Sequence, residues 1–382
     1  QMQRVLSQVG HVFRELQDAP DGVPIASLNM LNPSDSTELQ QWNELTVPTG
    51  KHQDQEFVHD MIRRRCQLQP DAVAVEAWDG SLTYGELDSY TEYLAAKLQL
   101  CGVRNDHFIA LYFEKSCWTI VAQLAVLKAG GALVMLEPSH PVDRRRDICQ
   151  TLDVMLILGP PHLTHSLEQE LNIKVLPISK AHLIVMDGEH LSVDSHIQSH
   201  NLMYAIATSG TTGCPKLALV HHGGFVATAR TLVDRLLLLA SSRVLQFSSY
   251  GFDASLVEQL LPLIVGGCVC VPTPFDRDNR LAFTMATMKI NWMVAPASVI
   301  HLLSPDTVPT LQTLISAGEP LQQSIIDVWA TRVNLINAYG PAECSMVCSV
   351  NPSVRPGTDP NNIGYPIGGT CWIVDPNDIN TL

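Results

Sequence analysis

Residues 206–216 read IATSGTTGCPK and place hydroxyl groups and glycines directly after a short apolar run. The run MYAIA at 203–207 is typical of a buried strand, so Thr208 to Pro215 is predicted to form the loop at the carboxyl end of that strand. Glycines let backbone N–H groups converge, the hydroxyls add donors, and Lys216 adds positive charge. The segment predicts a phosphate-binding loop that does not match the GxxxxGK[ST] pattern, and a flexible polar turn is the alternative.

Composition limits the classes of protein that fit. The chain has 382 residues, 46% of them hydrophobic, which indicates a folded protein with two or more packed subdomains. The formal net charge of -14 argues against nucleic acid as the main partner. Ten cysteines without a Cys-x-x-Cys pair favour reduced, mostly buried thiols in a cytoplasmic protein. No apolar run reaches the length of a membrane span, so we expect no membrane partner.

The pattern along the chain predicts two parts. Residues 1–50 are rich in Pro, Asp and Ser and contain one amphipathic stretch ending at Trp42, which is typical of a linker or docking segment. In residues 51–382, strand and helix patterns alternate through Val350, which predicts an α/β fold with two doubly wound, mainly parallel sheets. After Pro352 the Gly- and Pro-rich sequence indicates a small β-barrel-like segment. We also expect the chain to be a piece of a larger polypeptide.

Two short motifs carry further candidate site residues. In FDAS, Asp253 lies among apolar neighbours, and a buried carboxylate is unfavourable unless it is paired, for instance with a ligand ammonium. A helix N-cap is the alternative role. In NAYGPAE, the aromatic ring of Tyr339 follows an apolar run and is suited to stacking on a flat heterocycle, and Glu343 offers the oxygen ligand that Mg²⁺ prefers. Glu343 at a helix start is the simpler alternative.

Other polar clusters are predicted to be structural. His221 and His222 have no third ligand at metal spacing. Cys268 and Cys270 alternate along a strand and indicate packing. The basic run at 144–146 is expected on a solvated helix face.

Five segments together resemble the adenylate-forming enzymes, and in particular the adenylation domains of nonribosomal peptide synthetases. They are LTYGELD at 82–88, LKAGGALVMLEP at 127–138, SGTTGCPK at 209–216, FDAS at 252–255 and NAYGPAE at 337–343. The resemblance covers about residues 55–375 and implies the large N-terminal core subdomain of such a domain. Residues 1–50 resemble the linker that follows a condensation domain. Leu217 and Ala342 depart from the family's usual glycine and threonine.

The resemblance implies site residues by position. It assigns ATP or AMP binding to the phosphate loop, to SAGEP at 316–320 and to NAYG, namely Thr208, Ser209, Gly210, Thr211, Thr212, Gly213, Lys216, Gly318, Glu319, Asn337, Ala338, Tyr339 and Gly340. Glu343 is implied to hold Mg²⁺. Asp253 is implied to anchor the substrate amino group, and the pocket is implied to be lined by Asp253, Ala254, Val257, Val294, Ile315, Ala317, Ala338, Met346 and Val347.

The implied reaction is ATP-dependent formation of an aminoacyl-adenylate, followed by transfer to the phosphopantetheine of a carrier protein for secondary metabolite biosynthesis. Apart from Asp253 the implied pocket lacks charge, hydroxyl and amide groups, so we expect a bulky apolar substrate, Phe or Trp first and Leu or another branched aliphatic second. The family's catalytic lysine and C-terminal subdomain have no counterpart after Asp375, which predicts poor turnover by this chain. An acyl-CoA or aryl-acid ligase, a module that only binds nucleotide, and a scaffolding domain are the alternatives.

Overall fold

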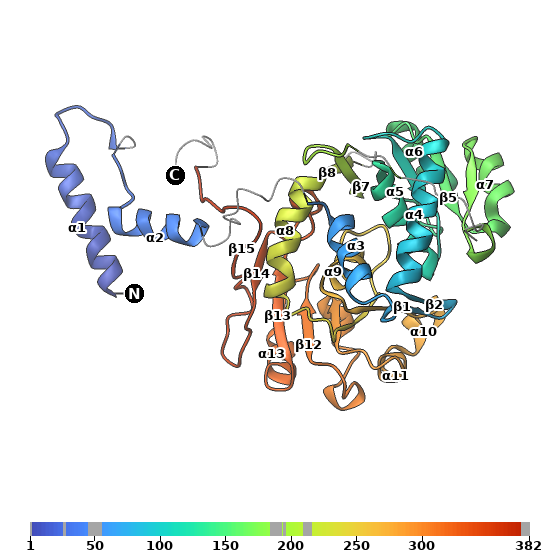
Figure 1. The fold of residues 1–382 in the computed structure, drawn as a ribbon. Helices are drawn as coiled ribbons and strands as arrows, with labels where there is room; N and C mark the ends of the chain where they lie inside the picture. The colour runs from blue at the N-terminus through green and yellow to red at the C-terminus, as the bar shows by residue number, and fades with distance from the viewer. Residues whose placement is uncertain are drawn as a thin grey trace. The chain divides into compact units, whose positions relative to one another are not determined.

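The structure is a computed structural model that describes residues 2–25, 28–44, 56–183, 193, 196–208 and 216–375. The chain divides into two compact units, one of residues 1–49 with 369–382 and one of residues 50–368. In the described ranges, no helix combines the length and apolar character that crossing a membrane requires. Figure 1 labels the elements.

The larger unit contains two sheets, both mainly parallel (Figure 1). The nine-stranded sheet has the order β15 (Tyr365–Pro366), β14 (Ser349–Asn351), β13 (Asn334–Tyr339), β12 (Thr313–Ser316), β11 (Trp292–Ala295), β9 (Arg243–Leu245), β10 (Cys268–Val271), β1 (Val73–Ala77), β2 (Gly80–Thr83). The six-stranded sheet has the order β6 (Val175–Pro177), β5 (Leu156–Gly159), β3 (Phe108–Leu111), β4 (Ala132–Met135), β7 (Leu202–Thr208), β8 (Lys216–His221). The antiparallel pairs are β1–β2, β13–β14, β14–β15 and β7–β8. The predicted α/β class is confirmed.

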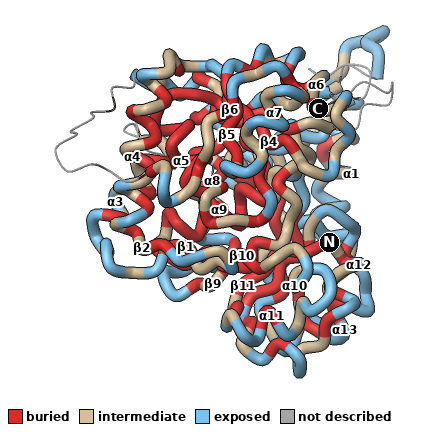
Figure 2. Tube along the Cα trace, turned by 90° about the vertical axis from the view of Figure 1, so that its right-hand side faces the viewer, coloured by how far each residue is buried: buried red, intermediate tan, exposed pale blue. Residues whose placement is uncertain are grey.

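Helices and sheets bury three apolar clusters. The central cluster takes side chains from both sheets and from α3 (Val58–Leu68), α4 (Tyr84–Leu100), α5 (Cys117–Ala129), α8 (His222–Arg235) and α9 (Ala254–Val265). The second lies on the other face of the larger sheet with α11 (Leu281–Thr287), α12 (Ala297–Ile300) and α13 (Gln323–Trp329). The third lies on the other face of the smaller sheet with α6 (Val142–Thr151) and α7 (Thr164–Leu171). Figure 2 shows this burial in red along β1, β10, β11 and α9. Helix α10 (Pro274–Asn279) precedes α11.

Local sequence signals explain where the central helices begin and end. Helix α4 begins with a capping box, in which Glu86 N donates to Thr83 Oγ1 at 3.2 Å and Thr83 N donates to Glu86 Oε2 at 2.9 Å. Helix α5 begins after Ser116, whose Oγ accepts from Trp118 N at 3.1 Å. It ends at Gly130, which has φ of 92°. These signals fix the ends of both helices in the sequence.

Two findings differ from the sequence predictions or add to them. The prediction of a solvated face at 144–146 is wrong for Arg145, which is buried because its guanidinium donates to Glu170 Oε1 at 2.6 Å and to the hydroxyl of Tyr112 at 3.2 Å. The segment after Pro352, predicted to be a small β-barrel-like unit, contributes β15, which extends the edge of the larger sheet. Of the described cysteines, Cys268 and Cys270 are buried in β10 as expected.

Among its described residues, the smaller unit contains the helices α1 (Met2–Asp18) and α2 (Pro33–Glu44). The sequence pattern predicted one amphipathic stretch ending at Trp42 and did not predict α1. Asn32 connects the two helices because its Nδ2 donates to Gln8 Oε1 and to Asp35 Oδ2, both at 2.7 Å. The apolar side of α1 is exposed, as at Leu6 (64%) and Phe13 (70%).

Candidate functional site

The predicted substrate residues on the larger sheet share one face at the carboxyl ends of neighbouring strands. Val294 of β11 pairs in register with Ile315 of β12, which pairs with Ile336 of β13. Ala317 and Ala338 lie two residues further along β12 and β13 and therefore point to the same face. This face belongs to the central apolar cluster that lies between the two sheets. Parallel α/β sheets bind ligands at this end of their strands.

Helix α9 and the turn after β13 supply the other apolar residues of the predicted pocket. Val257 of α9 is 3% exposed, and Met346 and Val347 are 4% and 8% exposed. All three belong to the same central cluster as Val294 and Ile315. The structure therefore brings together the apolar residues that the resemblance implied, although they come from four separate segments of the chain. Ala254 is half-buried at the start of α9.

The turn after β13 has an unusual backbone conformation. Ser345 and Met346 adopt φ of 53° and 77°, the left-handed region that bulky residues rarely occupy. The turn packs so closely on Gly340 that a Cβ atom at that position would lie 2.4 Å from Met346 O and 2.6 Å from the Cα of Val347. Gly340 is thus required by close backbone approach. Backbone conformations of this kind are found more often at functional sites than elsewhere.

Asp253 immediately precedes α9 and has a buried carboxylate oxygen. Its Oδ2 has no hydrogen-bond partner within the described part of the chain. Its side chain makes no capping hydrogen bond to α9, so the N-cap role is not supported. Burial raises the pKa of Asp253 to about 6, against a lowering effect of nearby backbone amides, including that of Met346. A buried carboxylate with one unsatisfied oxygen is suited to receive a cationic group.

The predicted nucleotide residues lie beside this pocket on β12 and β13. Ser316 pairs in register with Asn337, so the loop with Gly318 and Glu319 lies beside the end of β13. Asn337 is buried, and its Nδ2 donates to Asn362 O at 3.1 Å. Tyr339 is 51% exposed. An exposed ring above a buried, hydrogen-bonded asparagine is a surface on which a flat heterocycle could stack.

Glu319 has a local role as well. Its carboxylate accepts from Ser298 N at 2.7 Å and from Ser298 Oγ at 2.9 Å, which connects the loop after β12 to the start of α12. Gly318 in the same loop has φ of 82°.

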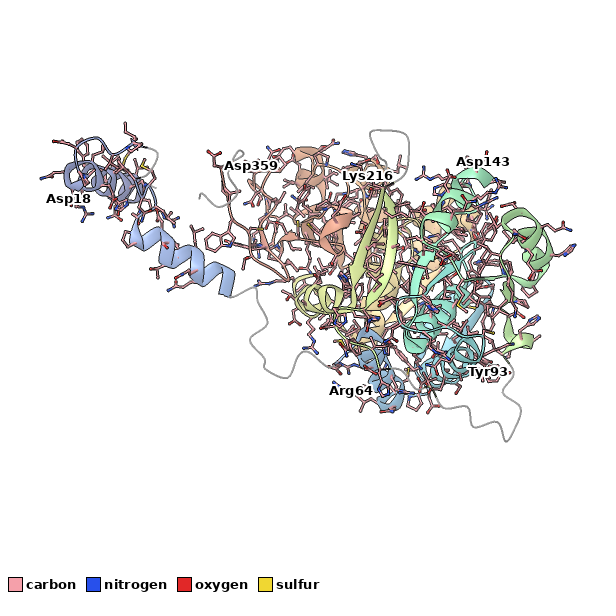
Figure 3. All side chains as sticks on the ribbon, turned by 90° about the horizontal axis from the view of Figure 1, so that it is seen from above. Asp18, Arg64, Tyr93, Asp143, Lys216 and Asp359 are labelled. Atoms are coloured by element: carbon pink, nitrogen blue, oxygen red, sulfur yellow. The ribbon has the colours of Figure 1, made fainter. Side chains whose placement is uncertain are left out.

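The two ends of the predicted phosphate loop lie on an antiparallel hairpin. Thr208 ends β7, Lys216 begins β8, and the two residues pair in register. Thr208 Oγ1 donates to Lys216 O at 3.2 Å. Figure 3 labels Lys216, which is exposed at the end of this hairpin. Residues 209–215 of the predicted loop lie outside the described residues, and with them the predicted site residues Ser209, Gly210, Thr211, Thr212 and Gly213.

Glu343 is exposed in the 3-10 helix η6 (Ala342–Cys344), which contacts β8. The described residues contain no cluster of three or more His, Cys, Asp or Glu side chains that could hold a metal ion by themselves. Mg²⁺ is commonly held by one or two carboxylates together with substrate phosphates. A single exposed carboxylate beside the hairpin fits that mode of binding.

Sequence reasoning missed a buried polar bridge beside the pocket, formed by Lys115, Gln246 and Glu258. Lys115 is 5% exposed, and Gln246 and Glu258 are fully buried. One signal could have found it, since Glu258 is the acidic residue of the apolar helix ASLVEQLLPLIV.

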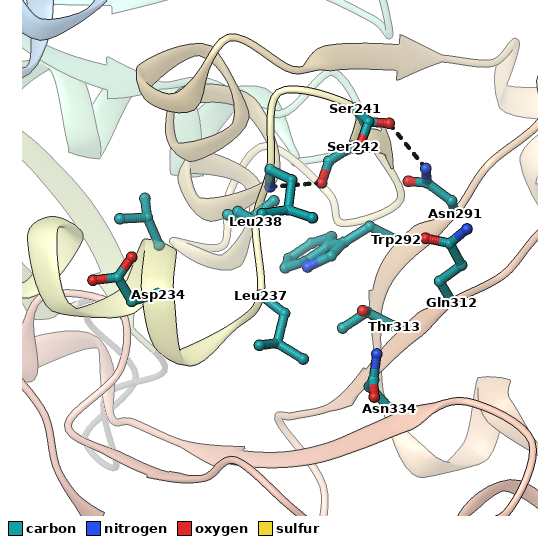
Figure 4. Close-up of a pocket in the computed structure, with 12 residues that line it drawn as sticks. Asp234, Leu237, Leu238, Ser241, Ser242, Asn291, Trp292, Gln312, Thr313 and Asn334 are labelled. Carbon is teal, nitrogen blue, oxygen red and sulfur yellow. Dashed lines mark hydrogen bonds between the residues drawn. The ribbon is translucent and has the colours of Figure 1, made fainter.

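A pocket of about 320 Å³ lies at the opposite ends of the same strands (Figure 4). Trp292, Thr313 and Asn334 are the first residues of β11, β12 and β13, and they line this pocket together with Leu237 and Asn291. The predicted substrate residues lie at the carboxyl ends, so this pocket is distinct from the candidate site.

Comparisons with known proteins identify the family. A family model described as AMP-binding enzyme matches residues 62–382. D-lysergyl-peptide-synthetase subunit 1 of Epichloe festucae var. lolii is 45% identical over 99% of this chain and 11% of its own length. The protein of the same name from Claviceps purpurea is 41% identical over 98% of this chain and 12% of its own length. The chain thus spans about a tenth of the length of these curated relatives.

The fold is similar to that of a solved structure. The crystal structure of the nonribosomal peptide synthetase FmoA3 in its alpha-methyl-L-serine-AMP bound form matches with a TM-score of 0.84 and 22% sequence identity. The match covers 97% of this chain and 42% of that one. The predicted adenylate-forming fold is thereby confirmed.

Proposed function

This chain belongs to the AMP-binding enzyme family of adenylate-forming ligases, and from that premise we propose that it activates an amino acid as part of a nonribosomal peptide synthetase. The observation that carries the proposal is the buried Oδ2 of Asp253, which has no hydrogen-bond partner among the described residues and immediately precedes the apolar helix α9. An α-ammonium group would satisfy this oxygen with a charge-assisted hydrogen bond. An aryl or fatty acid would leave it unsatisfied, which is unfavourable in a buried site.

The proposed roles follow from the positions of the residues. Tyr339 stacks on the adenine while Asn337 and the backbone at Gly318 and Glu319 border it. The loop from Thr208 to Lys216 cradles the phosphates. Asp253 binds the ammonium group of the amino acid and thereby positions its carboxylate. The carboxylate attacks the α-phosphate of ATP and displaces pyrophosphate, which yields the aminoacyl-adenylate.

Glu343 would hold Mg²⁺, which when bound offsets the phosphate charge during this displacement. We propose that the catalytic lysine belongs to a C-terminal subdomain and that this chain alone turns over poorly. The proposed partners are that subdomain, a condensation domain and a carrier protein whose phosphopantetheine accepts the aminoacyl group. We propose a cytoplasmic location without nucleic-acid or membrane partners, with residues 1–50 as a linker and residues 51–382 as the N-terminal core subdomain.

We propose that the substrate side chain is bulky and apolar. Val257, Val294, Ile315 and Met346 all belong to the central apolar cluster, so hydrocarbon groups supply the implied lining. A polar side chain buried there without partners would be disfavoured by about 1–3 kcal/mol. Phe or Trp is the first choice and Leu or another branched aliphatic residue is the second.

The test measures the exchange of labelled pyrophosphate into ATP by a polypeptide in which this chain is extended to a complete adenylation domain. The proteinogenic amino acids and a set of aryl and fatty acids are offered as substrates. We expect exchange that depends on an apolar or aromatic amino acid. Preference for an acid without an amino group would contradict the role of Asp253, and preference for a charged amino acid would contradict the apolar pocket.

Nucleotide binding is tested separately by calorimetry on this chain with ATP and AMP. We expect binding that weakens by about tenfold in Tyr339→Ala, because base–aromatic stacking contributes about 1–3 kcal/mol. Phe275→Ala is the matched control, since Phe275 is a comparably exposed aromatic residue (59%) on α10. Equal loss in both variants would contradict the assignment of Tyr339.

A further inference from the structure

The loop at 246–251 connects β9 to α9 and leads directly into Asp253. Three charged side chains from outside the loop hold it: Lys115, Glu137 and Glu258. Two of them, Lys115 and Glu137, follow strands β3 and β4 of the smaller sheet, whereas the loop follows a strand of the larger sheet. The position of Asp253 therefore depends on contacts between the two sheets.

Lys115 lies in the connection between β3 and α5 and is buried. Its Nζ donates to Gln246 Oε1 and to Ser248 O. The same ammonium lies 4.4 Å from the centre of the Tyr250 ring. These partners are three residues of one loop, so a single buried cation fixes the loop along its length.

Glu258 lies on α9 one turn beyond Asp253 and next to Val257 of the proposed pocket, and it holds the same loop from the other side. Its Oε2 accepts from Gln246 Nε2 and from Ser248 N, both at 2.9 Å. Its Oε1 accepts from Ser248 Oγ at 2.8 Å. Lys115 and Glu258 are thus bridged through Gln246 and Ser248.

Glu137 completes the support at the end of the loop nearest Asp253. Its Oε1 accepts from Ser249 Oγ at 2.5 Å and from Gly251 N. A Cβ atom at position 251 would lie 3.1 Å from the Glu137 side chain, so the two are in close contact.

The buried bridge pairs one positive charge, on Lys115, with one negative charge, on Glu258. Burial raises the pKa of the Glu258 carboxyl and lowers the pKa of the Lys115 ammonium, and each charge counters the effect on the other. Removal of one charge leaves the other buried without compensation, whereas removal of both does not. The two residues should therefore behave as a unit under mutation.

We propose that Lys115 and Glu258 are positioning residues of the amino-acid site, which hold the loop at 246–251 so that Asp253 and Val257 face the substrate. The inference rests on the proposed function. Neither side chain is assigned a contact with substrate or with nucleotide, and both act through the loop and the first turn of α9. Their effect should fall on amino-acid binding and leave nucleotide binding unchanged.

The experiment measures pyrophosphate exchange in the complete adenylation domain for Lys115→Met, Glu258→Gln and the double variant. Lys128→Met is the matched control, because Lys128 is a second buried lysine (6% exposed), on α5, that pairs with Asp88 at 2.6 Å and not with the loop. We expect each single variant to raise the KM for the amino acid by about tenfold or more and to change the KM for ATP by less than about twofold. The control should leave both KM values within about twofold.

The double variant shows whether Lys115 and Glu258 act as a coupled pair or contribute independently to the amino-acid KM. We expect its amino-acid KM to rise less than the product of the two single effects, because it leaves no uncompensated charge. The inference would be overturned if the single variants raised both KM values in parallel or raised neither. It would also be overturned if the effect of the double variant equalled the product of the two single effects. In each of these cases an active wild-type domain would still support the proposed function. A wild-type domain without amino-acid-dependent exchange would overturn both.

Discussion

Asp253 shows how one buried carboxylate can serve binding at the expense of stability. Its Oδ2 has no hydrogen-bond partner among the residues that the structure describes, and burial raises the pKa of Asp253 to about 6. The ionised form is therefore unfavourable in the protein alone, and a cationic ligand relieves this cost. The same oxygen that would recognise an ammonium group destabilises the folded chain when no ligand is bound.

We predict that amino-acid binding depends on pH through Asp253. Above pH 6 the carboxylate is ionised and affinity should be constant, whereas below pH 6 protonation should weaken binding, approaching about tenfold per pH unit. Calorimetric titration of phenylalanine into the wild-type chain between pH 5 and 8 measures this. Asp253→Asn should bind at least about tenfold more weakly at pH 7, with little dependence on pH and unchanged ATP affinity. A wild-type affinity that is constant from pH 5 to 8 would argue against the role.

Asp253→Asn should also stabilise the fold at neutral pH. The folded pKa of about 6 lies above the ordinary value of 3.8, so the folded state holds more protons between these values and the carboxylate destabilises it as pH rises through this window. Because the residue is only half-buried, we expect a gain of about 1–2 kcal/mol in the free energy of unfolding at pH 7. Urea unfolding at pH 7 and pH 4 checks this, since the gain should disappear at pH 4.

We predict that Val257→Trp shifts substrate preference towards smaller side chains. Val257 is 3% exposed in the cluster that contains Val294 and Ile315, so an indole at this position must occupy the proposed substrate space. The exchange panel should show lower activity with Phe and Trp relative to Ala. Val265→Trp, at the half-buried end of the same helix, is the control and should keep the wild-type order. An unchanged order in Val257→Trp would place the pocket elsewhere.

At the scale of elements, the alternation of strand and helix patterns was sufficient to predict the α/β class of the larger unit. Strand β7 lies where the apolar run at 203–207 places it. Periodicity could not predict the turn after β13, where Ser345 and Met346 adopt the left-handed conformation without being glycine. It also could not pair Lys115 with Gln246, which lies 131 residues away, because such contacts depend on how the two sheets pack. Motif residues predicted a candidate site, but not the buried groups that support it.

The contact between α3 and α8 leads to a prediction about acid stability. His59 and His222 are buried with ring centres 5.9 Å apart, and burial lowers the pKa of each to about 3. The unfolded chain holds more protons between pH 3 and 6.5, so stability should fall as pH falls below 6.5, by at most about 1.4 kcal/mol per pH unit for each histidine.

Urea unfolding at several values between pH 5 and 7.5 measures this slope. His222→Leu should reduce the slope below pH 6.5 relative to wild type because one buried imidazole no longer titrates. His301→Leu is the control, since His301 is exposed and should leave the slope unchanged. Identical slopes in wild type and His222→Leu would show that this histidine contributes nothing to acid sensitivity.

At the scale of the whole molecule, the larger unit is built around one core shared by both sheets. The central cluster contains residues of β3, β4 and β7 as well as residues of β1, β10 and β11. The candidate site lies where the carboxyl ends of both sets of strands meet this core. The proposed binding groups for nucleotide and amino acid all lie in this larger unit, and we propose that the catalytic lysine belongs to a further subdomain.

We predict that this chain binds both substrates but forms adenylate slowly. Loss of one charge-stabilising contact in a transition state typically lowers the rate by about 10²–10³-fold. Exchange by this chain should be slower by about that factor than exchange by the complete adenylation domain, with similar dissociation constants for ATP. Full-rate exchange by the chain alone would mean that it holds its own catalytic residues.

The buried bridge also affects how substrate preference can be re-engineered by exchanging segments between relatives. A graft of residues 253–347 would carry Asp253, Val257 and Glu258 into a host. It would leave behind Lys115, Glu137 and the loop at 246–251 that they hold. Such a chimera would place a foreign Glu258 opposite the host's residue at position 115, and a mismatch would bury an uncompensated charge beside the pocket. Grafts that begin before residue 246 and match position 115 should therefore yield active hybrids more often than grafts chosen from the pocket residues alone.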